Sequence, residues 1–182
     1  MNREAGVEER LRYPIGRFAG SGRLTGEERI QYIQIIRGLS GELRALIQPL
    51  TGEQMDTPYR DGGWSVREVV HHLADSGMYA YLRFKRGLTE TAPEIPTYRE
   101  DLWAQRSDYS EEPVESSLQL LESLHRRFVR LLDTLDGAEF ERTLVSQGLG
   151  VMTLDTALER YVWHSRHHMA HIAGLMARNG WH

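Results

Sequence analysis

The sequence contains no cysteine among its 182 residues. Disulfide bonds are therefore excluded, and a metal site would have to use imidazole, carboxylate or solvent ligands. No apolar run approaches the roughly 20 residues that cross a bilayer, and the opening stretch "MNREAGVEERLRYPIGRF" lacks the apolar segment of a signal peptide. These absences predict a soluble, cytoplasmic protein with no membrane partner.

An excess of positive charge is also missing. The formal net charge is −4, whereas proteins that bind nucleic acids or anionic membrane surfaces carry clusters of lysine and arginine. The composition therefore gives no indication of a nucleic-acid partner.

Four segments place apolar residues at steps of three and four positions, as amphipathic helices do. Capping boxes at Thr25–Glu28 and Ser65–Glu68 open the first two, Pro113 stands in the first turn of the third, and Asn179–Gly180 ends the fourth. The predicted helices span residues 25–49, 65–87, 113–136 and 153–178.

No segment of similar length alternates with a period of two, so the predicted fold class is all-α, a four-helix bundle. The length fits one domain over residues 1–182, with residues 1–24 as an extended N-terminal arm. Residues 88–112 form a long connection between the second and third helices, and "YREDLWAQ" within it could be a short extra helix. The connection 138–152 could contain a small hairpin.

Four of the eight histidines crowd into "WHSRHHMAH", residues 163–171. At about 100° per residue, His168 borders the apolar stripe of this helix and His164 lies next to it, whereas His167 and His171 lean towards solvent. The pair His164 and His168 has the i, i+4 spacing that lets two imidazoles hold one divalent ion.

A third ligand would have to come from another helix, where His71 and His72 are adjacent. The same periodicity places His72 nearer the apolar stripe than His71, so His72 is the candidate. Three neutral imidazoles with a vacant position are typical of a catalytic metal site. Histidines on a helix are also common as exposed residues without a specific function. The spacing alone leaves both interpretations open, metal ligands and surface residues. His125 is interpreted as an ordinary helix residue, and His182 as part of a frayed end.

These residues lie in blocks that resemble the DinB superfamily, and more closely its YfiT-type branch of metal-dependent hydrolases or bacillithiol S-transferases. The blocks are "YPIG", "DTPYRDGGWSVREVVHHLADS", "YVWHSRHHMAHI" and "NGWH". The resemblance implies a four-helix bundle, usually a homodimer, with one nickel or zinc ion held by three histidines. It carries the ligand positions onto His72, His164 and His168.

One stretch departs from the family pattern. Many YfiT-like chains carry a histidine-proline pair before the last helix, where this chain reads "LVSQGLG". The substrate of this protein could therefore differ from that of its relatives.

A metal held by three histidines keeps its full charge and lowers the pKa of bound water or of a bound thiol. The resemblance favours a transferase that activates a bacillithiol-type thiol for attack on an electrophile. A metal-dependent hydrolase and a non-catalytic metal-binding stress-response module remain alternatives. No general base or other catalytic residue is assigned.

Supporting roles remain open for several other side chains. Asp75, one turn from His72, could accept a hydrogen bond from a ligand imidazole or could be a surface carboxylate. Tyr161 could line the pocket or belong to the core. Three arginines could bind an anionic thiol, although solvated helix charges are the default interpretation; they are Arg67, Arg160 and Arg166.

Overall fold

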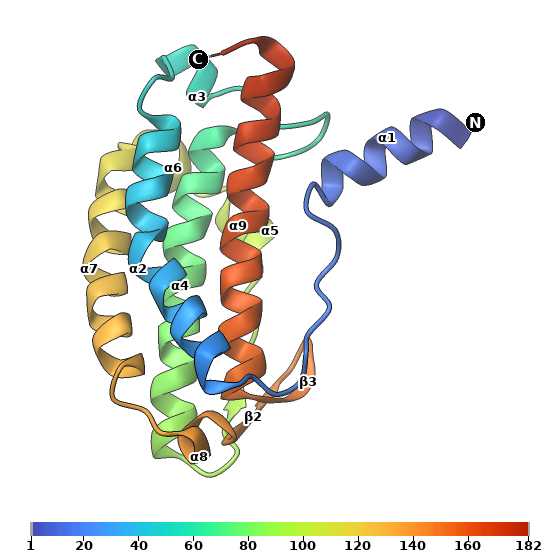
Figure 1. Cartoon of the computed structure of the whole chain (residues 1–182). Coiled ribbons are helices and arrows are strands. Elements are labelled where there is room, and N and C mark those ends of the chain that lie inside the picture. Colours follow the sequence, from blue (N-terminus) through green and yellow to red (C-terminus); the bar gives the residue numbers. More distant parts are fainter. Residues whose placement is uncertain (1, 182) are drawn as a thin grey trace.

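The computed structural model describes residues 2–181, and the side chains of residues 6–181. Four long helices lie side by side (Figure 1), so the predicted four-helix bundle is confirmed. They are α2 (Gly26–Ile47), α4 (Val66–Thr89), α7 (Val114–Leu132) and α9 (Leu154–Asn179). Helix α4 packs against α7 and α9, and α2 packs against the same two helices. Therefore α2 and α4 occupy diagonal corners of the bundle.

The helices begin where side chains satisfy their first free backbone N–H groups. Thr25 and Ser65 accept from the backbone N–H of Glu28 and Glu68, and each glutamate accepts from the cap in return. Thr153 caps α9 by accepting from Thr156 N–H. These local contacts are readable in the sequence, which explains why the predicted starts agree with the structure.

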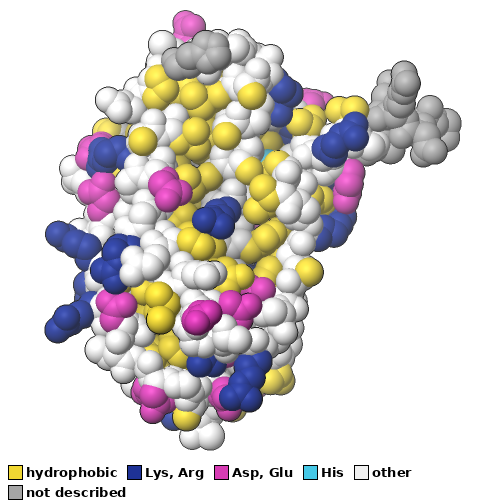
Figure 2. Space-filling view, viewed as in Figure 1, with side chains coloured by type: hydrophobic (Ala, Val, Ile, Leu, Met, Phe, Trp, Pro, Cys, Tyr) yellow, Lys and Arg dark blue, Asp and Glu magenta, His cyan; other side chains and the backbone are white. Residues whose placement is uncertain are grey.

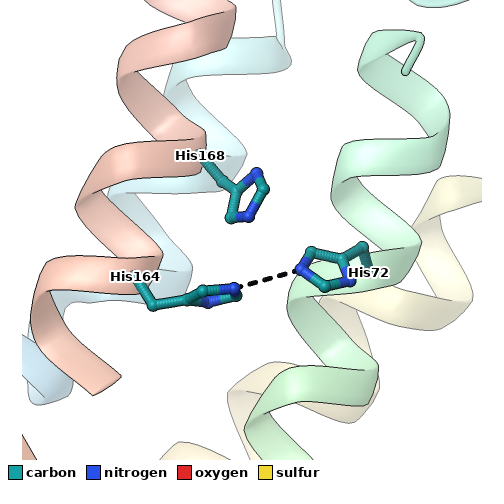
Figure 3. Close-up of side chains that lie close together, drawn as sticks. All are labelled: His72, His164 and His168. Atoms are coloured by element: carbon teal, nitrogen blue, oxygen red, sulfur yellow. Dashed lines mark hydrogen bonds between the residues drawn. The ribbon is translucent and has the colours of Figure 1, made fainter. Parts of the chain in front are cut away.

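The bundle interior consists of two apolar clusters stacked along the helix axes. From α4 and α9, one cluster takes Ala80, Phe84, Leu158 and Tyr161, and the other takes Val69, Leu73, Ile172 and Leu175. On α9, His164 and His168 fall between these two sets in sequence, and His72 faces them from the Val69–Leu73 stretch of α4 (Figure 3). The histidines therefore lie where one apolar cluster gives way to the other.

The connections carry shorter elements than the bundle helices. They are α3 (Gly52–Met55), β1 (Glu94–Ile95), α5 (Glu100–Trp103), α6 (Ser107–Glu111), α8 (Gly137–Phe140), β2 (Thr143–Ser146) and β3 (Gly150–Thr153). Helix α5 confirms the extra helix expected in "YREDLWAQ", and β2 pairs with β3 as the expected hairpin. The pairing of β1 with β2, which is parallel, was not predicted. It ties the two long connections together at one end of the bundle.

The N-terminal region differs from the expected extended arm. Residues Asn2–Arg12 form α1, which stands away from the bundle in Figure 1. This helix is rich in Glu and Arg and has no apolar stripe, so a search for hydrophobic periodicity does not find it. Arg12 and Glu8 form an i, i+4 ion pair on it.

Helix α4 continues to Thr89, two residues past the predicted end at Gly87. Gly87 does not stop the helix but allows a close approach, because a Cβ there would lie 2.9 Å from Leu154 Cδ2. Within residues 2–181, no helix is both long and apolar enough to span a membrane.

Candidate metal centre

The structure brings together the three imidazoles that the sequence selects (Figure 3). His72 points from α4 towards His164 and His168, which project from adjacent turns of α9. One ring nitrogen from each residue lies within 4.8 Å of the others, and Nε2 of His72 is 3.2 Å from Nε2 of His164. Two nitrogens bound to one tetrahedral ion at about 2.1 Å would be roughly 3.4 Å apart. The spacing therefore fits a single divalent ion.

Burial keeps these imidazoles neutral. His72 is 1% exposed, and its burial lowers its pKa to about 4. Burial also holds the pKa values of His164 and His168 well below the ordinary value, and the repulsion that protonated neighbouring histidines would exert lowers both further. At neutral pH each ring thus carries an unprotonated nitrogen, which a metal ion requires.

Aromatic side chains enclose the triad. The ring of Trp64, from the turn that precedes α4, lies 4.6 Å from the ring of His72 and 5.9 Å from that of His168. The hydroxyl of Tyr98, from the connection between α4 and α7, lies 3.4 Å from Nδ1 of His72. If Nδ1–H donates to this hydroxyl, Nε2 keeps its lone pair facing His164.

The donor set also fits a metal with a vacant coordination position. Nδ1 of His168 is buried without a hydrogen-bond partner in the described chain. No carboxylate and no fourth imidazole joins the three rings within residues 2–181. Three neutral imidazoles suit nickel and zinc alike.

A cavity of about 380 Å³ adjoins the triad, and His164 forms part of its wall. Its lining comes from α4, residues 97–101, the β2–β3 hairpin and α9. Phe84, Leu149 and Met152 supply apolar surface, and Tyr79 and Tyr98 supply aromatic rings. A mixed lining of this volume is typical of small-molecule sites.

Two expectations about the other histidines of α9 are wrong. His167 and His171 were expected to face solvent but are 7% and 4% exposed. The ring of His167 lies 5.9 Å from that of Tyr13, and the ring of His171 stacks on Tyr59 at 4.0 Å. Nε2 of His171 also lies 3.2 Å from the carbonyl oxygen of Arg12. Segments distant in sequence cover this face of α9, which a helical wheel cannot reveal. Accordingly, hardly any histidine surface is visible on the face in Figure 2.

His125, interpreted from the sequence as an ordinary helix residue, is buried in the bundle. It is 3% exposed, and its Nε2 lies 2.6 Å from the hydroxyl of Tyr161. Tyr161 both lines the cavity and belongs to the core, so the two roles considered for it are compatible. His182 lies outside the described residues. His71 is buried beside His72, and its Nδ1 lies 2.8 Å from Ser117 Oγ.

Asp75 does not support a ligand histidine directly. Its Oδ2 accepts a hydrogen bond of 2.5 Å from the Tyr109 hydroxyl, which joins α6 to α4. Burial raises the pKa of Asp75, partly offset by this hydrogen bond. The carboxylate thus anchors the long connection that carries Tyr98.

The three arginines considered for anion binding lie in different surroundings. Arg67 forms an ion pair with Asp56, and Arg166 is exposed. Arg160 is half-buried and lines the cavity, as does Arg83, for which no role was predicted. Arg83 follows His72 by three helical turns and so shares its face of α4, a relation that the sequence contains.

Comparison with known proteins agrees with this architecture. The DinB superfamily profile matches residues 37–172. This chain belongs to the DinB superfamily. Other members include the "Putative metal-dependent hydrolase" proteins of Bacillus mycoides (strain KBAB4), 47% identical, and of Bacillus subtilis (strain 168), YfiT, 44% identical. Each alignment covers 94% of this chain, with 98% and 97% of the respective relative.

A solved DinB-superfamily structure has nearly the same fold. YfiT from Bacillus subtilis, described as "a probable metal-dependent hydrolase with an unusual four-helix bundle topology", superposes with a TM-score of 0.92. The sequences are 43% identical, and the alignment covers 95% of this chain and 99% of YfiT. The fold is therefore that of YfiT along nearly the whole chain.

Proposed function

We propose that this protein is a metal-dependent S-transferase. It binds one divalent transition metal per chain, nickel or zinc, through His72, His164 and His168, and joins a bacillithiol-type thiol to an electrophilic substrate. The position of His164 carries the proposal, because this residue belongs to both the imidazole triad and the cavity wall. A small molecule in the cavity would therefore lie beside the ion.

A divalent ion at the triad would supply Lewis acidity that lowers the pKa of an adjacent thiol or water molecule. The protein provides three neutral imidazoles for it, and these leave the positive charge of the ion uncompensated. Among the described residues, His164 is the only imidazole in the cavity lining, and the chain has no cysteine. The chain therefore offers no thiol of its own, and the proposed reaction takes its nucleophile from the substrate or from water.

In the transfer step, the thiol loses its proton to solvent and its sulfur forms a bond to the electrophilic carbon. The leaving group departs with the electron pair of the bond that breaks. Tyr79 and Tyr98 offer aromatic surface for the electrophile, and Phe84 and Met152 exclude water from part of the cavity. These side chains bind and orient the reactants, which brings them within bonding distance.

A metal-dependent hydrolase is the second candidate, and the names of the relatives favour it. The same triad and cavity would serve it, with water in place of the thiol. The two functions differ in the nucleophile and not in the metal site, so only an assay separates them.

The test begins with metal analysis of the freshly purified protein, followed by removal and restoration of nickel and zinc. Thiol conjugation is measured with bacillithiol and monochlorobimane, and ester hydrolysis with p-nitrophenyl acetate. We expect conjugation with the metal-loaded protein and only the background rate with stripped protein or with His72→Ala. His71→Ala is the matched control, because it removes the adjacent histidine and leaves the triad complete.

Ester hydrolysis without conjugation would overturn the transferase in favour of the hydrolase. A protein that binds metal at the triad yet catalyses neither reaction would be a non-catalytic metal-binding module. We further propose a cytoplasmic homodimer, which the family resemblance supports. Light scattering coupled to size-exclusion chromatography should then give twice the mass of the chain.

A further inference from the structure

Two arginines line the cavity from two different helices, and neither has an ion-pair partner in the described chain. Arg83 on α4 and Arg160 on α9 both line it and are both half-buried. Nε of Arg83 is buried and has no hydrogen-bond partner, and neither guanidinium forms an ion pair within residues 6–181. Arg160 does lie over the ring of Phe18, 5.5 Å from its centroid.

This arrangement is unfavourable for the free protein. A guanidinium removed from water needs an acceptor, and two neighbouring cations repel each other. Burial lowers the pKa of Arg83, and the charge of Arg160 lowers it further. Burial also lowers the pKa of Arg160. Arginine nevertheless stays protonated at neutral pH, so the cavity carries two positive charges that no ion pair compensates within residues 6–181.

The carboxylates of the cavity do not neutralise this pair. Asp101 binds Arg99 instead, with Oδ2 2.6 Å from Nη2. Glu100 is exposed and close enough for its charge to raise the pKa of Arg160, so it offsets part of that charge, but no ion pair joins the two within residues 6–181. By contrast, the well-buried Arg29 is fully paired with Asp155. Arg83 and Arg160, unlike Arg29, therefore lack an ion-pair partner in the described chain.

The two arginines are also close to the candidate metal centre. Both charges contribute to lowering the pKa of His164. Arg160 precedes His164 by one helical turn on α9, and Arg83 follows His72 by three turns on α4. A molecule held by the guanidinium groups would extend towards the triad.

We infer that Arg83 and Arg160 form a subsite for an oxyanionic group of the substrate, a carboxylate or a phosphate, whose reactive end lies at His164. Guanidinium groups bind both oxyanions through paired hydrogen bonds. The placement of the reactive end rests on the proposed function, whereas the binding of the oxyanion does not.

The test measures equilibrium binding by calorimetry to metal-stripped and metal-loaded protein. The probes are 3-mercaptopropionate, inorganic phosphate and the uncharged 2-mercaptoethanol. The variants are Arg83→Met and Arg160→Met, each with a control on the same helix: Lys85→Met on α4 and Arg166→Met on α9, both exposed.

We expect at least one oxyanion, but not 2-mercaptoethanol, to bind the metal-stripped protein. Each arginine variant should weaken that binding about tenfold or more, and the controls by less than twofold.

Thermal unfolding provides a second readout. Removing an unpaired buried cation should leave the variants at least as stable as the parent protein, so loss of binding would not reflect misfolding. The bound probe should raise the melting temperature of the parent protein but not that of the arginine variants. The subsite is overturned if neither oxyanion binds or if the controls weaken binding equally.

The two proposals can fail separately. Oxyanion binding to stripped protein without any conjugation or hydrolysis would reject the proposed function and keep the subsite. Metal-dependent conjugation with unchanged Michaelis constants for 3-mercaptopropionate in both arginine variants would reject the subsite alone.

Discussion

His72 is held by side chains that the chain supplies from outside its helix. Trp64 packs on one face of its ring, and Tyr98 reaches Nδ1 from the long connection. Tyr98 in turn stacks on Tyr79, with ring centroids 4.3 Å apart. A ligand histidine whose second nitrogen is bound keeps one tautomer and one ring orientation, which favours metal binding.

Replacing Tyr98 with Phe should therefore weaken metal affinity about tenfold, the lower end of effects seen when a ligand loses its outer partner. The contact is long at 3.4 Å, so a larger loss is not expected. Competition with a metal-binding dye measures the affinity. Tyr79→Phe is the matched control, because no hydrogen bond of its hydroxyl is present in the described structure; equal effects of both variants would contradict the role given to Tyr98.

At the residue scale, the sequence was sufficient to select the three histidines of the triad but not to place the side chains that surround them. The spacing of His164 and His168 and the apolar neighbours of His72 are local patterns, so helix geometry turns each of them towards the bundle interior, where α4 packs against α9. The positions of Tyr98 and Trp64 depend on how loops fold over the bundle. The burial of His171 under the N-terminal segment depends on the same long-range packing.

At the scale of elements, one buried ion pair joins the start of α2 to the start of α9. Arg29 donates to both carboxylate oxygens of Asp155 at 2.7 Å, and Leu24 N–H donates to Oδ2 at 3.2 Å. The side chains are 13% and 1% exposed. Removing one partner leaves a buried charge without compensation.

The substitution Arg29→Met should therefore lower the free energy of unfolding by about 3 to 5 kcal/mol. Urea denaturation followed by circular dichroism measures it. Arg37→Met is the control on the same helix, because its pair with Asp133 is about half exposed and should contribute at most about 1 kcal/mol. Similar losses in the two variants would show that burial does not determine the strength of these pairs.

The helices and strands that could be predicted are those with a local pattern in the sequence. Capping boxes and apolar periodicity identify α2 and α4 with starts close to the observed ones. Strand β1 has only two residues and exists through its pairing with β2, so no local pattern indicates it. Helix α1 lacks an apolar face and was missed for that reason.

At the scale of the whole molecule, we expect the apolar clusters to keep the bundle folded without the metal. The two clusters contain 18 and 11 buried residues, and no residue of the triad belongs to either of them. Treatment with EDTA should therefore leave the helical circular dichroism unchanged at 25 °C. The melting temperature should fall by about 10 °C, the shift expected for losing a tight ligand from a domain of this size. Unfolding at 25 °C on chelation would instead identify the ion as a structural element.

Buried histidines affect the stability of the whole molecule in acid, and His125, which is not one of the three proposed metal ligands, provides a test. Burial lowers its pKa from 6.5 to about 4. Below pH 6.5 the unfolded chain binds a proton that the native protein resists, so stability is complete above this pH and is lost as the pH falls towards 4. The expected contribution is about 3 kcal/mol.

The variant His125→Gln removes this titration and keeps a polar partner for Tyr161. Between about pH 7 and pH 4, metal-stripped His125→Gln should lose about 3 kcal/mol less stability than the metal-stripped parent protein. Urea denaturation at both pH values measures the two losses, and comparing differences cancels any packing defect that the substitution introduces at neutral pH. Equal losses in the two proteins would mean that the native fold admits a proton at His125, and the acid sensitivity would then have to arise elsewhere in the bundle.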